Sequence, residues 1–514
     1  MIQSRTHNCN ELRLSDAGKN VTIVGWYENI RKVSKNLGFL ILRDFYGTTQ
    51  VVIETEEMMQ VIDSVNKEST ISVTGVVRER SSKNKDLATG EIEVVPEKIE
   101  ILGKCIYNAL PFEINQSKDA DENTRLKYRY LDLRNPAVKG NIVLRSKIVA
   151  ELRQKMNSLN FMEITTPILT CSSPEGARDY LVPARNHPGK FYALPQAPQQ
   201  FKQILMASGF DRYFQIAPCF RDEDARADRS PGEFYQLDME MAFASQEDVF
   251  SVVEEVLPPV FEKYGVYKTA SKAPFVRIPY LESMDKYGSD KPDLRIDLVL
   301  QDATEVMADC GFGPFEGQTV KAIVVDGFTA TRKVIDGICA EVEVQTANKA
   351  FWFKLDENGE LVGGISKFLQ DRKEAVIAAL GLKPGDFVGL TAGKKLAAQK
   401  TAGVLRKLLG AASDKHMKKD CYEFCWIVDF PMYEIGEESG ELEFCHNPFS
   451  MPQGGMDALN NQDPLGILAY QYDLVCNGVE LSSGAVRNHD PEIMIKAFEL
   501  VGLGEDDVKA KFPA

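Results

Sequence analysis

The first part of the chain alternates apolar and polar positions over short runs, a pattern typical of half-buried β-strands. A helical pattern over residues 56–65 separates the third run from the fourth. Five strands with a helix in that position are typical of an OB-fold barrel, whose loops grip oligonucleotides. We therefore predict an OB-fold domain over residues 1–105, with strands over residues 21–27, 39–44, 50–54, 70–80 and 91–101.

Basic side chains gather in two predicted loops of this barrel, and Phe39 lies close to the first of them in sequence. Lysine and arginine can bind phosphates there, and an aromatic ring can stack a base. Charge alone leaves a second interpretation equally open, in which the loops are only solvated and Phe39 belongs to the core. The basic residues are Arg31, Lys32 and Lys35 between the first two strands, and Arg78, Arg80, Lys83 and Lys85 at the hairpin of the last two.

A long amphipathic helix is predicted over residues 141–159, after a charged connector over residues 106–140. Apolar side chains recur there every three or four residues and form one stripe. An extended segment over residues 161–169 follows, and its Pro167 suits an edge strand or a contact between subunits. The stripe consists of Leu144, Ile148, Leu152, Met156 and Leu159.

Two predicted strands, residues 213–220 and 233–243, enclose an arginine-rich loop. On the second strand Gln236, Asp238 and Glu240 alternate with apolar residues, so one face is polar and the other belongs to the core. Such a polar row beside arginines suits a site for a polyphosphate and an ammonium together. The alternative is an ordinary half-exposed hairpin with a charged turn. The core side chains are Tyr235, Leu237, Met239, Met241 and Phe243, and the loop carries Arg221, Arg226 and Arg229.

A second hairpin is predicted near the end of the chain, with strands over residues 469–476 and 479–483 joined by an Asn-Gly turn. Asp473 and Glu480 flank this turn. Carboxylate oxygens are the ligands that Mg²⁺ prefers, so the pair is a candidate metal site, although two carboxylates at this spacing are also common as surface charges.

Composition excludes several classes of protein. The 514 residues are 44% hydrophobic and 26% charged, as in globular proteins of several domains. No apolar run approaches the roughly 18 residues of a membrane span, and the N-terminus lacks the apolar core of a signal peptide. The ten cysteines are scattered and complete no zinc site, which predicts free thiols in a reducing cytoplasm. The net charge of −15 restricts any nucleic-acid contact to local basic patches.

Taken in order, these segments resemble the class II aminoacyl-tRNA synthetases. Residues 161–167, after the long helix, are similar to motif 1, the element that forms a homodimer in this family. Residues 220–224 read Phe-Arg-Asp-Glu-Asp, and residues 232–240 read Gly-Glu-Phe-Tyr-Gln-Leu-Asp-Met-Glu; together they resemble motif 2. The segments similar to the aspartyl members specifically are residues 172–183, 192–203, 444–449 and 477–491.

The resemblance implies the reaction and the residues that serve it. The carboxylate of L-aspartate attacks the α-phosphate of ATP, and the aspartyl group then passes to the terminal ribose of tRNA, so catalysis is positioning and charge neutralisation. Arg221 is the implied catalytic residue, on the α-phosphate. Lys202 and Arg487 clamp the aspartate side chain, since two cations select a carboxylate over an amide. Glu175 and Gln199 hold the ammonium.

The complete implied sets are larger. The aspartate-binding side chains are Glu175, Gln199, Lys202, Arg221, Asp238, His446 and Arg487. The ATP-binding side chains are Arg221, Asp222, Glu223, Ser230, Phe234 and Glu480. The anticodon of tRNA is read by Arg31, Phe39, Gln50, Asn84 and Glu93, and Mg²⁺ is held by Asp473 and Glu480.

The expected fold class is α+β: an OB-fold barrel, a class II antiparallel sheet flanked by helices, and an inserted α/β domain. The insertion has its own strand over residues 322–325 and helices over residues 371–379 and 394–409, and it indicates the bacterial type of aspartyl enzyme. The predicted domains are residues 1–105 (anticodon binding), 106–140 (hinge), 141–290 and 426–514 (catalytic) and 291–425 (insertion).

Two other functions remain open, and the sequence departs from the family pattern at one motif. An asparaginyl or lysyl synthetase shares the fold, and a non-catalytic tRNA-binding paralogue is the second alternative. Class II enzymes end in motif 3, a Gly-rich strand with an arginine-led helix, and no such segment follows residue 501. We therefore expect weak adenylate formation by residues 1–514. Charging of a second tRNA, that for asparagine, is left open.

Overall fold

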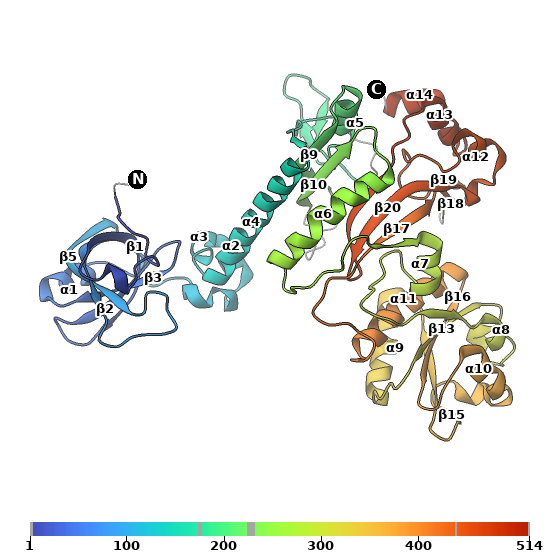
Figure 1. The fold of residues 1–514 in the computed structure, drawn as a ribbon, viewed down its shortest axis with the longest axis horizontal. Coiled ribbons are helices and arrows are strands. Elements are labelled where there is room, and N and C mark those ends of the chain that lie inside the picture. The colour runs from blue at the N-terminus through green and yellow to red at the C-terminus, as the bar shows by residue number, and fades with distance from the viewer. Residues whose placement is uncertain (1–3, 173–176, 224–231, 437–438, 512–514) are drawn as a thin grey trace. The chain divides into compact units, whose positions relative to one another are not determined.

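The computed structural model describes residues 4–172, 177–223, 232–436 and 439–511 (Figure 1). The chain divides into two compact units, Met1–Ser146 and Lys147–Ala514. Each unit has its own buried core. Among the described residues, no helix has both the length and the apolar character needed to cross a membrane.

The first unit contains a closed five-stranded barrel with strand order β1-β2-β3-β5-β4, which confirms the predicted OB-fold. The inward side chains, such as Ile23, Leu40 and Val73, are fully buried. Gly75 lies at an irregularity between β4 and β5, where a Cβ atom would stand 2.1 Å from the Val95 carbonyl oxygen, so the strands approach too closely for another residue. The elements are β1 (Asn20–Lys32), β2 (Gly38–Arg43), β3 (Thr48–Ile53), α1 (Glu56–Asp63), β4 (Thr70–Glu79) and β5 (Ile92–Gly103).

The predicted connector forms two short helices, α2 (Glu122–Lys127) and α3 (Arg129–Asp132). Asp132 is fully buried, and Ser117, Arg125 and Arg129 all donate to its carboxylate. These charges therefore stabilise a folded segment instead of solvating a linker, which the charge pattern alone did not indicate.

The long helix α4 (Pro136–Ser158) begins five residues before the predicted start at residue 141. The apolar stripe marks only the part of the helix that packs, whereas the start is set by Asn135 and Pro136. The side chain of Asn135 accepts a hydrogen bond from the Ala137 backbone N–H at 2.9 Å, and proline suits the first helical position.

The second unit contains two sheets that meet on helix α6 (Gln246–Tyr264). The sheet orders are β10-β9-β6 and β11-β17-β20-β21, antiparallel except for the pairs β6–β9 and β11–β17. Phe250 of α6 stacks on Trp426 of the second sheet with ring centroids 4.0 Å apart, and Val256 packs on Phe214 of the first. The strands are β6 (Met162–Glu163), β9 (Arg212–Phe220), β10 (Glu233–Met241), β11 (Val276–Pro279), β17 (Phe424–Pro431), β20 (Leu468–Cys476) and β21 (Val479–Ala485).

Shorter elements complete this part of the second unit. The helix Pro491–Glu499 is capped by Asp490, whose carboxylate accepts from the Glu492 and Ile493 backbone N–H groups. The remaining elements are β7 (Leu181–Pro183), β8 (Phe191–Ala193), α5 (Gln199–Ala207), α7 (Tyr280–Tyr287), β18 (Tyr433–Ile435), β19 (Leu442–Phe444), α12 (Gly455–Asn461), α13 (Pro491–Glu499) and α14 (Glu505–Lys511).

The insertion folds around an antiparallel sheet of order β12-β13-β16-β14-β15 with helices on both faces. Successive residues of β13 alternate between the two cores: Ala322 packs with α8 and α10, and Ile323 packs with α9 and α11. The elements are β12 (Leu300–Asp302), α8 (Thr304–Met307), β13 (Thr319–Val325), α9 (Arg332–Thr346), β14 (Ala350–Leu355), β15 (Leu361–Val362), α10 (Lys373–Leu380), β16 (Phe387–Gly393) and α11 (Lys395–Ala411).

Two side chains predicted for the core of β10 are exposed. The strand ends at Met241, and Phe243 adopts a φ of 54° with a fully exposed ring as the chain turns into α6. Tyr235 is 49% exposed. The alternation prediction is therefore wrong at both ends of the strand, whereas Leu237 and Met239 pack against α6 and α4 as expected.

Candidate active site

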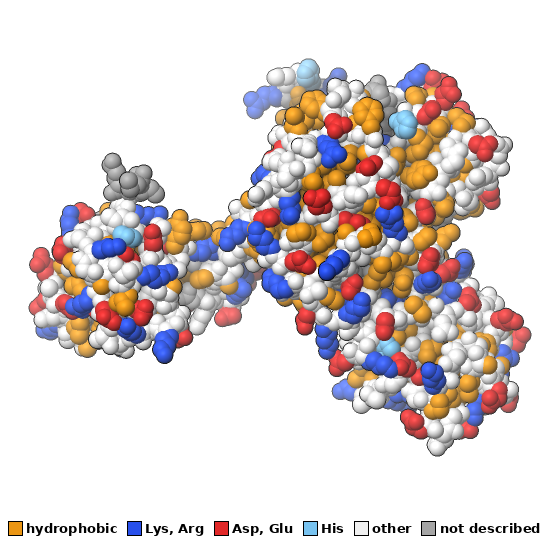
Figure 2. All heavy atoms as spheres, viewed as in Figure 1, with side chains coloured by type: hydrophobic (Ala, Val, Ile, Leu, Met, Phe, Trp, Pro, Cys, Tyr) orange, Lys and Arg blue, Asp and Glu red, His pale blue; other side chains and the backbone are white. Residues whose placement is uncertain are grey.

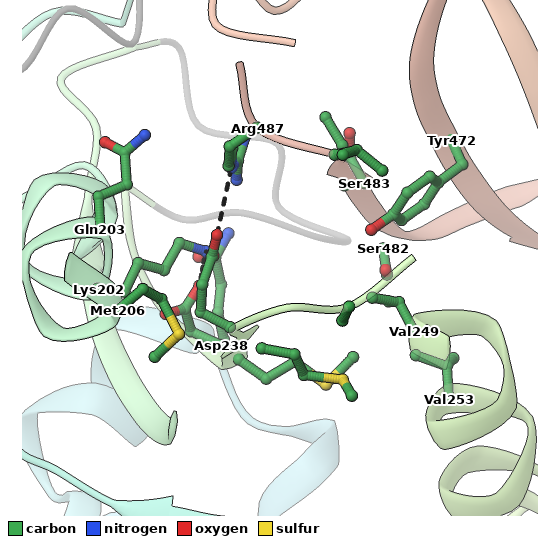
Figure 3. Close-up of a pocket in the computed structure, with 18 of the residues that line it drawn as sticks. Lys202, Gln203, Met206, Asp238, Val249, Val253, Tyr472, Ser482, Ser483 and Arg487 are labelled. Carbon is green, nitrogen blue, oxygen red and sulfur yellow. Dashed lines mark hydrogen bonds and ion pairs between the residues drawn. The ribbon is translucent and has the colours of Figure 1, made fainter. Parts of the chain in front are cut away.

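A pocket of about 1490 Å³ opens over β10 of the second unit, between helices α5 and α6 and strand β21. In Figure 3, Lys202 and Met206 of α5 lie on one side of it, and Ser483 and Tyr472 lie on the other. Arg487 enters from the segment that follows β21. The predicted site residues that line the pocket are Lys202, Arg221, Phe234, Asp238, Glu480 and Arg487.

Four charged side chains form a buried network in this pocket. The Lys202 ammonium lies 2.6 Å from an Asp238 carboxylate oxygen and 3.4 Å from Glu240. The Arg487 guanidinium lies 3.5 Å from the other oxygen of Glu240 and donates to Gln199 Oε1 at 2.9 Å. Lys202 and Asp238 are each less than a tenth exposed. The two cations expected to clamp a ligand are thus already paired with two carboxylates.

The pairing fixes the charge states of the network. Burial alone would lower the pKa of Lys202, but the nearby Asp238 and Glu240 carboxylates raise it above its ordinary value. Burial likewise opposes ionisation of Glu240, and Lys202 and Arg487 hold its pKa below the ordinary range. At neutral pH Lys202 and Glu240 therefore stay charged and paired, which is the arrangement that buried charges require.

Three buried atoms of the network have no hydrogen-bond partner among the described residues: Gln199 Nε2, Arg487 Nη1 and Asp238 Oδ2. The first two are donors and the third is an acceptor. Buried polar groups are almost always paired in folded proteins, and here Arg487 and Asp238 line the pocket while Gln199 contacts Arg487, so the three atoms are placed to bind a ligand. The ligand they fit carries an acceptor such as a carboxylate and a donor such as an ammonium.

Arg221 and Phe234 form the adjoining part of the pocket. The guanidinium lies over the phenylalanine ring at 5.1 Å, and its Nε, buried, has no partner among the described residues. The Arg221 backbone N–H donates to the Gly232 carbonyl, which closes the predicted loop. Asp222 and Glu223 are exposed. Glu175 and Ser230, also predicted, lie outside the described residues.

The two candidate metal ligands lie on neighbouring strands. Asp473 on β20 is 6% exposed, and its Oδ1 has no partner among the described residues. Burial, and then the Glu480 charge, raise the pKa of Asp473 to about 7. Glu480 on β21 pairs with Lys291 at 3.1 Å. No cluster of three or more candidate metal ligands occurs in the part of the chain that is described.

His446 is not among the described residues that line the pocket. Its ring packs edge-on against Phe430 at 5.1 Å and against Tyr280 at 6.3 Å. It therefore does not close the pocket in this arrangement of the chain.

The predicted anticodon residues lie on the barrel of the first unit, and several are already paired. Arg31 lies over the Phe39 ring at 4.9 Å. Gln50 donates to Glu93 at 2.9 Å, and Arg78 pairs with Glu93 at 2.8 Å. Asn84 lies in the hairpin, where its side chain accepts from the Asp86 backbone N–H.

The predicted basic patch of this barrel is partly neutralised. Arg78 also pairs with Glu54, and Lys83 pairs with Glu79 at 2.8 Å and with Glu91 at 3.3 Å. Only Arg80 and Lys85 of the hairpin cations have no ion pair among the described residues. Counting basic residues along the sequence overlooked the glutamates that the barrel brings beside them.

Sequence reasoning missed two residues of the pocket. Glu240 was placed on the polar face of β10 but received no role, although it bridges both cations. Lys291 was assigned to the edge of the insertion, yet it lines the pocket. The alternation on β10 signalled the first, whereas no local pattern signals the second.

The chain matches two protein families. Residues 121–514 match the tRNA synthetases of class II (D, K and N), and residues 21–102 match the OB-fold nucleic acid binding domain. The aspartate–tRNA ligase of Streptomyces avermitilis is 51% identical over 100% of this chain and 87% of its own length. The aspartate–tRNA(Asp/Asn) ligase of Rickettsia felis is 50% identical with the same coverage.

A solved structure of asparaginyl-tRNA synthetase from Entamoeba histolytica superposes with a TM-score of 0.56 at 17% identity, covering 98% of this chain and 87% of its own. The fold alone thus does not separate aspartate from asparagine enzymes.

Proposed function

The chain belongs to the class II tRNA synthetases of the aspartate, lysine and asparagine group, within its aspartate–tRNA ligases, and we propose that it activates L-aspartate with ATP and transfers it to tRNA. Identity of half the residues over the whole chain supports aspartate over the lysyl and asparaginyl alternatives. An enzymatic rather than a merely tRNA-binding role is supported by the same relatives and by the buried charges of the pocket.

The observation that carries the substrate assignment is the buried network around Lys202 and Arg487. Its unpaired groups, Arg487 Nη1 and Gln199 Nε2, donate to oxygens of the substrate carboxylate, and the unpaired Asp238 oxygen accepts from a donor of the substrate. An asparagine side chain would present an amide NH₂ to the Arg487 donor and leave it unpaired, which costs affinity. Asp238 and Glu240 orient both cations.

ATP binds at the Arg221 end of the pocket in this proposal. The guanidinium stabilises charge on the α-phosphate while the aspartate carboxylate attacks it, and pyrophosphate leaves. Phe234 supplies a ring face for the adenine, and Asp222, Glu223 and Ser230 complete the nucleotide contacts. Because Arg221 covers the Phe234 ring in the structure, the guanidinium moves aside when the base stacks.

Mg²⁺ fits Asp473 and Glu480. Magnesium is held in proteins by one or two carboxylates together with substrate phosphates and water, so two protein ligands suffice. The unpaired, buried Asp473 oxygen supports this assignment. When bound, the cation neutralises charge on the phosphates.

The barrel of the first unit binds the anticodon of tRNA, with Phe39 as a stacking surface and Arg31, Gln50, Asn84 and Glu93 around it. The OB-fold supports this, as does the polar network that Gln50 and Arg78 form with the buried Glu93 across three of its strands. The barrel supplies local basic contacts in a chain whose net charge is −15.

The protein acts as a homodimer through the motif 1 helix and strand. Met162, Ile168 and Leu169 leave large apolar side chains exposed on this segment, at 57%, 45% and 54%. Exposed apolar surface of this kind indicates a protein contact.

All ten cysteines are free, which suits the reducing cytoplasm where tRNA is charged.

Transfer of labelled aspartate to purified tRNA tests the proposed function. We expect aspartyl-tRNA to form with tRNA for aspartate, and no product with labelled asparagine or lysine. A parallel reaction with tRNA for asparagine decides whether this chain shares the dual activity in the name of its Rickettsia relative. Charging with asparagine in place of aspartate would contradict the assignment.

A further inference from the structure

Lys291 lines the same pocket as the aspartate network but lies at its carboxylate end, against Asp290 and Glu480. Its ammonium is 2.9 Å from Asp290 and 3.1 Å from Glu480, and the side chain is 35% exposed. An ammonium has three donors, and no third partner occurs among the described residues.

The charges around Lys291 change when nucleotide binds. Asp290, Asp473 and Glu480 place three carboxylates near one ammonium, so the empty pocket holds Lys291 as a counter-ion. Mg²⁺ on Asp473 and Glu480 would take over that role, and the phosphates would then add negative charge beside the displaced ammonium. A lysine on a flexible stem is suited to follow the charge and donate to phosphate oxygens.

The segment that carries Lys291 is fixed by helix α11 of the insertion. Gly288 ends α7 with a φ of 67°, and a Cβ atom on Gly403 of α11 would lie 2.3 Å from the Gly288 carbonyl oxygen. The two backbones are therefore in contact, three residues before Lys291. On its other side the buried Arg406 donates to the carbonyl oxygens of Asp293, Ile296 and Leu298, at 3.1, 2.5 and 2.6 Å.

We propose that Lys291 is a further polyphosphate-binding residue of the pocket, and that helix α11 of the insertion positions it through Gly403 and Arg406. The inference rests on the proposed function, because it places ATP and the pyrophosphate product at the Glu480 end. It also gives the insertion a part in nucleotide binding, through contacts that hold the loop between α7 and β12.

Binding calorimetry with Mg·ATP, with Mg·pyrophosphate and with aspartate tests Lys291 directly. Lys291→Met should weaken both phosphate ligands by about 10- to 100-fold, the usual effect of losing a charge-assisted hydrogen bond, and leave aspartate affinity unchanged. Lys291→Arg should restore most of the loss. Lys286→Met is the matched control, since this lysine of α7 is exposed and its one ion-pair partner among the described residues is Glu282, at 2.7 Å.

Gly403→Ala tests the positioning role. The added methyl pushes against the Gly288 carbonyl, so we expect weaker Mg·ATP binding, an unchanged dissociation constant for aspartate and a modest fall in melting temperature. An equal loss for aspartate and ATP would show general damage and contradict positioning.

The outcomes separate this inference from the proposed function. If the unsubstituted protein binds Mg·ATP and Lys291→Met binds it equally well, or if Lys286→Met loses as much, the role of Lys291 is wrong and the proposed function stands. Tighter Mg·ATP binding by Lys291→Met would show competition with the metal and also overturn it. If the unsubstituted protein binds neither phosphate ligand, both fail together.

Discussion

Lys202 and Arg487 share the same carboxylate partner but depend on it differently. Lys202 neutralises both Asp238 and Glu240, whereas Arg487 contacts Glu240 at 3.5 Å and keeps a second partner in Gln199. Removal of one member of a buried ion pair leaves an uncompensated charge and costs about 3–5 kcal/mol of stability. The two cations are therefore not equivalent targets for mutation, although the sequence made them look so.

Arg487→Met should separate substrate recognition from folding. We expect aspartate affinity to fall by about 10- to 100-fold because one charge-assisted hydrogen bond of about 1.5–3 kcal/mol is lost, with a small change in melting temperature. Lys202→Met should lower both affinity and melting temperature, since it strands two buried carboxylates. Calorimetry and thermal unfolding measure the two effects, and Arg332→Met, at an 84% exposed arginine of α9, is the control. Equal stability losses would contradict the asymmetry.

Asp473 gives the stability of the protein a pH dependence of its own. Burial raises its pKa to about 7 in the folded chain, from about 3.9 in the unfolded chain. The folded state therefore binds the proton more tightly than the unfolded state. The contribution of Asp473 to the free energy of unfolding falls as pH rises from about 4 to about 7. Above that range the ionised carboxylate costs stability of the order of a few kcal/mol.

Asp473→Asn removes this titration. The variant should gain stability relative to the unsubstituted protein at pH 8 and little at pH 5, as measured by urea unfolding without metal or nucleotide. A stability difference that is the same at both pH values would mean that Asp473 titrates normally.

At the scale of elements, most of the fold could be predicted because each element carries its own periodicity. The barrel strands and the hairpins β9–β10 and β20–β21 appear within a few residues of their predicted bounds, and Gly478 of the turn has the positive φ it requires. The predictions for Phe243 and for the start of α4 were wrong. The chain reverses direction at Phe243, and capping by Asn135 sets the start of α4, so the apolar pattern decides neither.

The site was predicted only in part, because ion pairing depends on contacts between distant segments. Lys291 meets Glu480 across the whole length of the insertion, and nothing local in the sequence indicates that pair. Arg78 meets Glu54 and Glu93 only when β3, β4 and β5 form the barrel. The roles of the site residues could be assigned from the family resemblance, whereas their ion-pair partners could be identified only from the structure.

The barrel hairpin should show which of its cations meet the tRNA backbone. We expect Arg80→Gln with Lys85→Gln to lower the slope of log affinity against log salt by about 1.4, at roughly 0.7 per single-stranded phosphate contact. Arg78→Gln with Lys83→Gln should change the slope little, because those side chains pair with glutamates. Filter binding of tRNA at several salt concentrations measures both. If neither double variant changes the slope measured for the unsubstituted protein, all four residues are solvated loop charges that do not contact tRNA.

At the scale of the whole molecule, charges of both signs are interspersed on the face drawn in Figure 2, as expected of a chain that binds nucleic acid only locally. Met162, Ile168 and Leu169 of the motif 1 segment are among the apolar side chains that are exposed in a single copy of the chain. Their burial against a second copy would complete the apolar stripe of α4, of which Leu144 is 39% exposed while Met156 is buried.

Leu169→Glu should weaken that contact. We expect the unsubstituted protein to sediment as a dimer and the variant to shift toward monomer at micromolar concentration, since a charge would be buried without a partner. Val344→Glu, at a 79% exposed valine of α9, is the matched control and should leave the dimer intact. A monomeric unsubstituted protein would contradict the proposed assembly.

Activation of aspartate in this pocket is open to direct measurement. Aspartate-dependent exchange of labelled pyrophosphate into ATP, measured with asparagine as a competitor, tests it most directly. We predict weak exchange that depends on aspartate, is lost in Arg487→Met, and is not inhibited by an equal concentration of asparagine. Exchange supported equally by asparagine would contradict the assignment of the Lys202 and Arg487 network. Strong inhibition of aspartate-dependent exchange by an equal concentration of asparagine would contradict it as well.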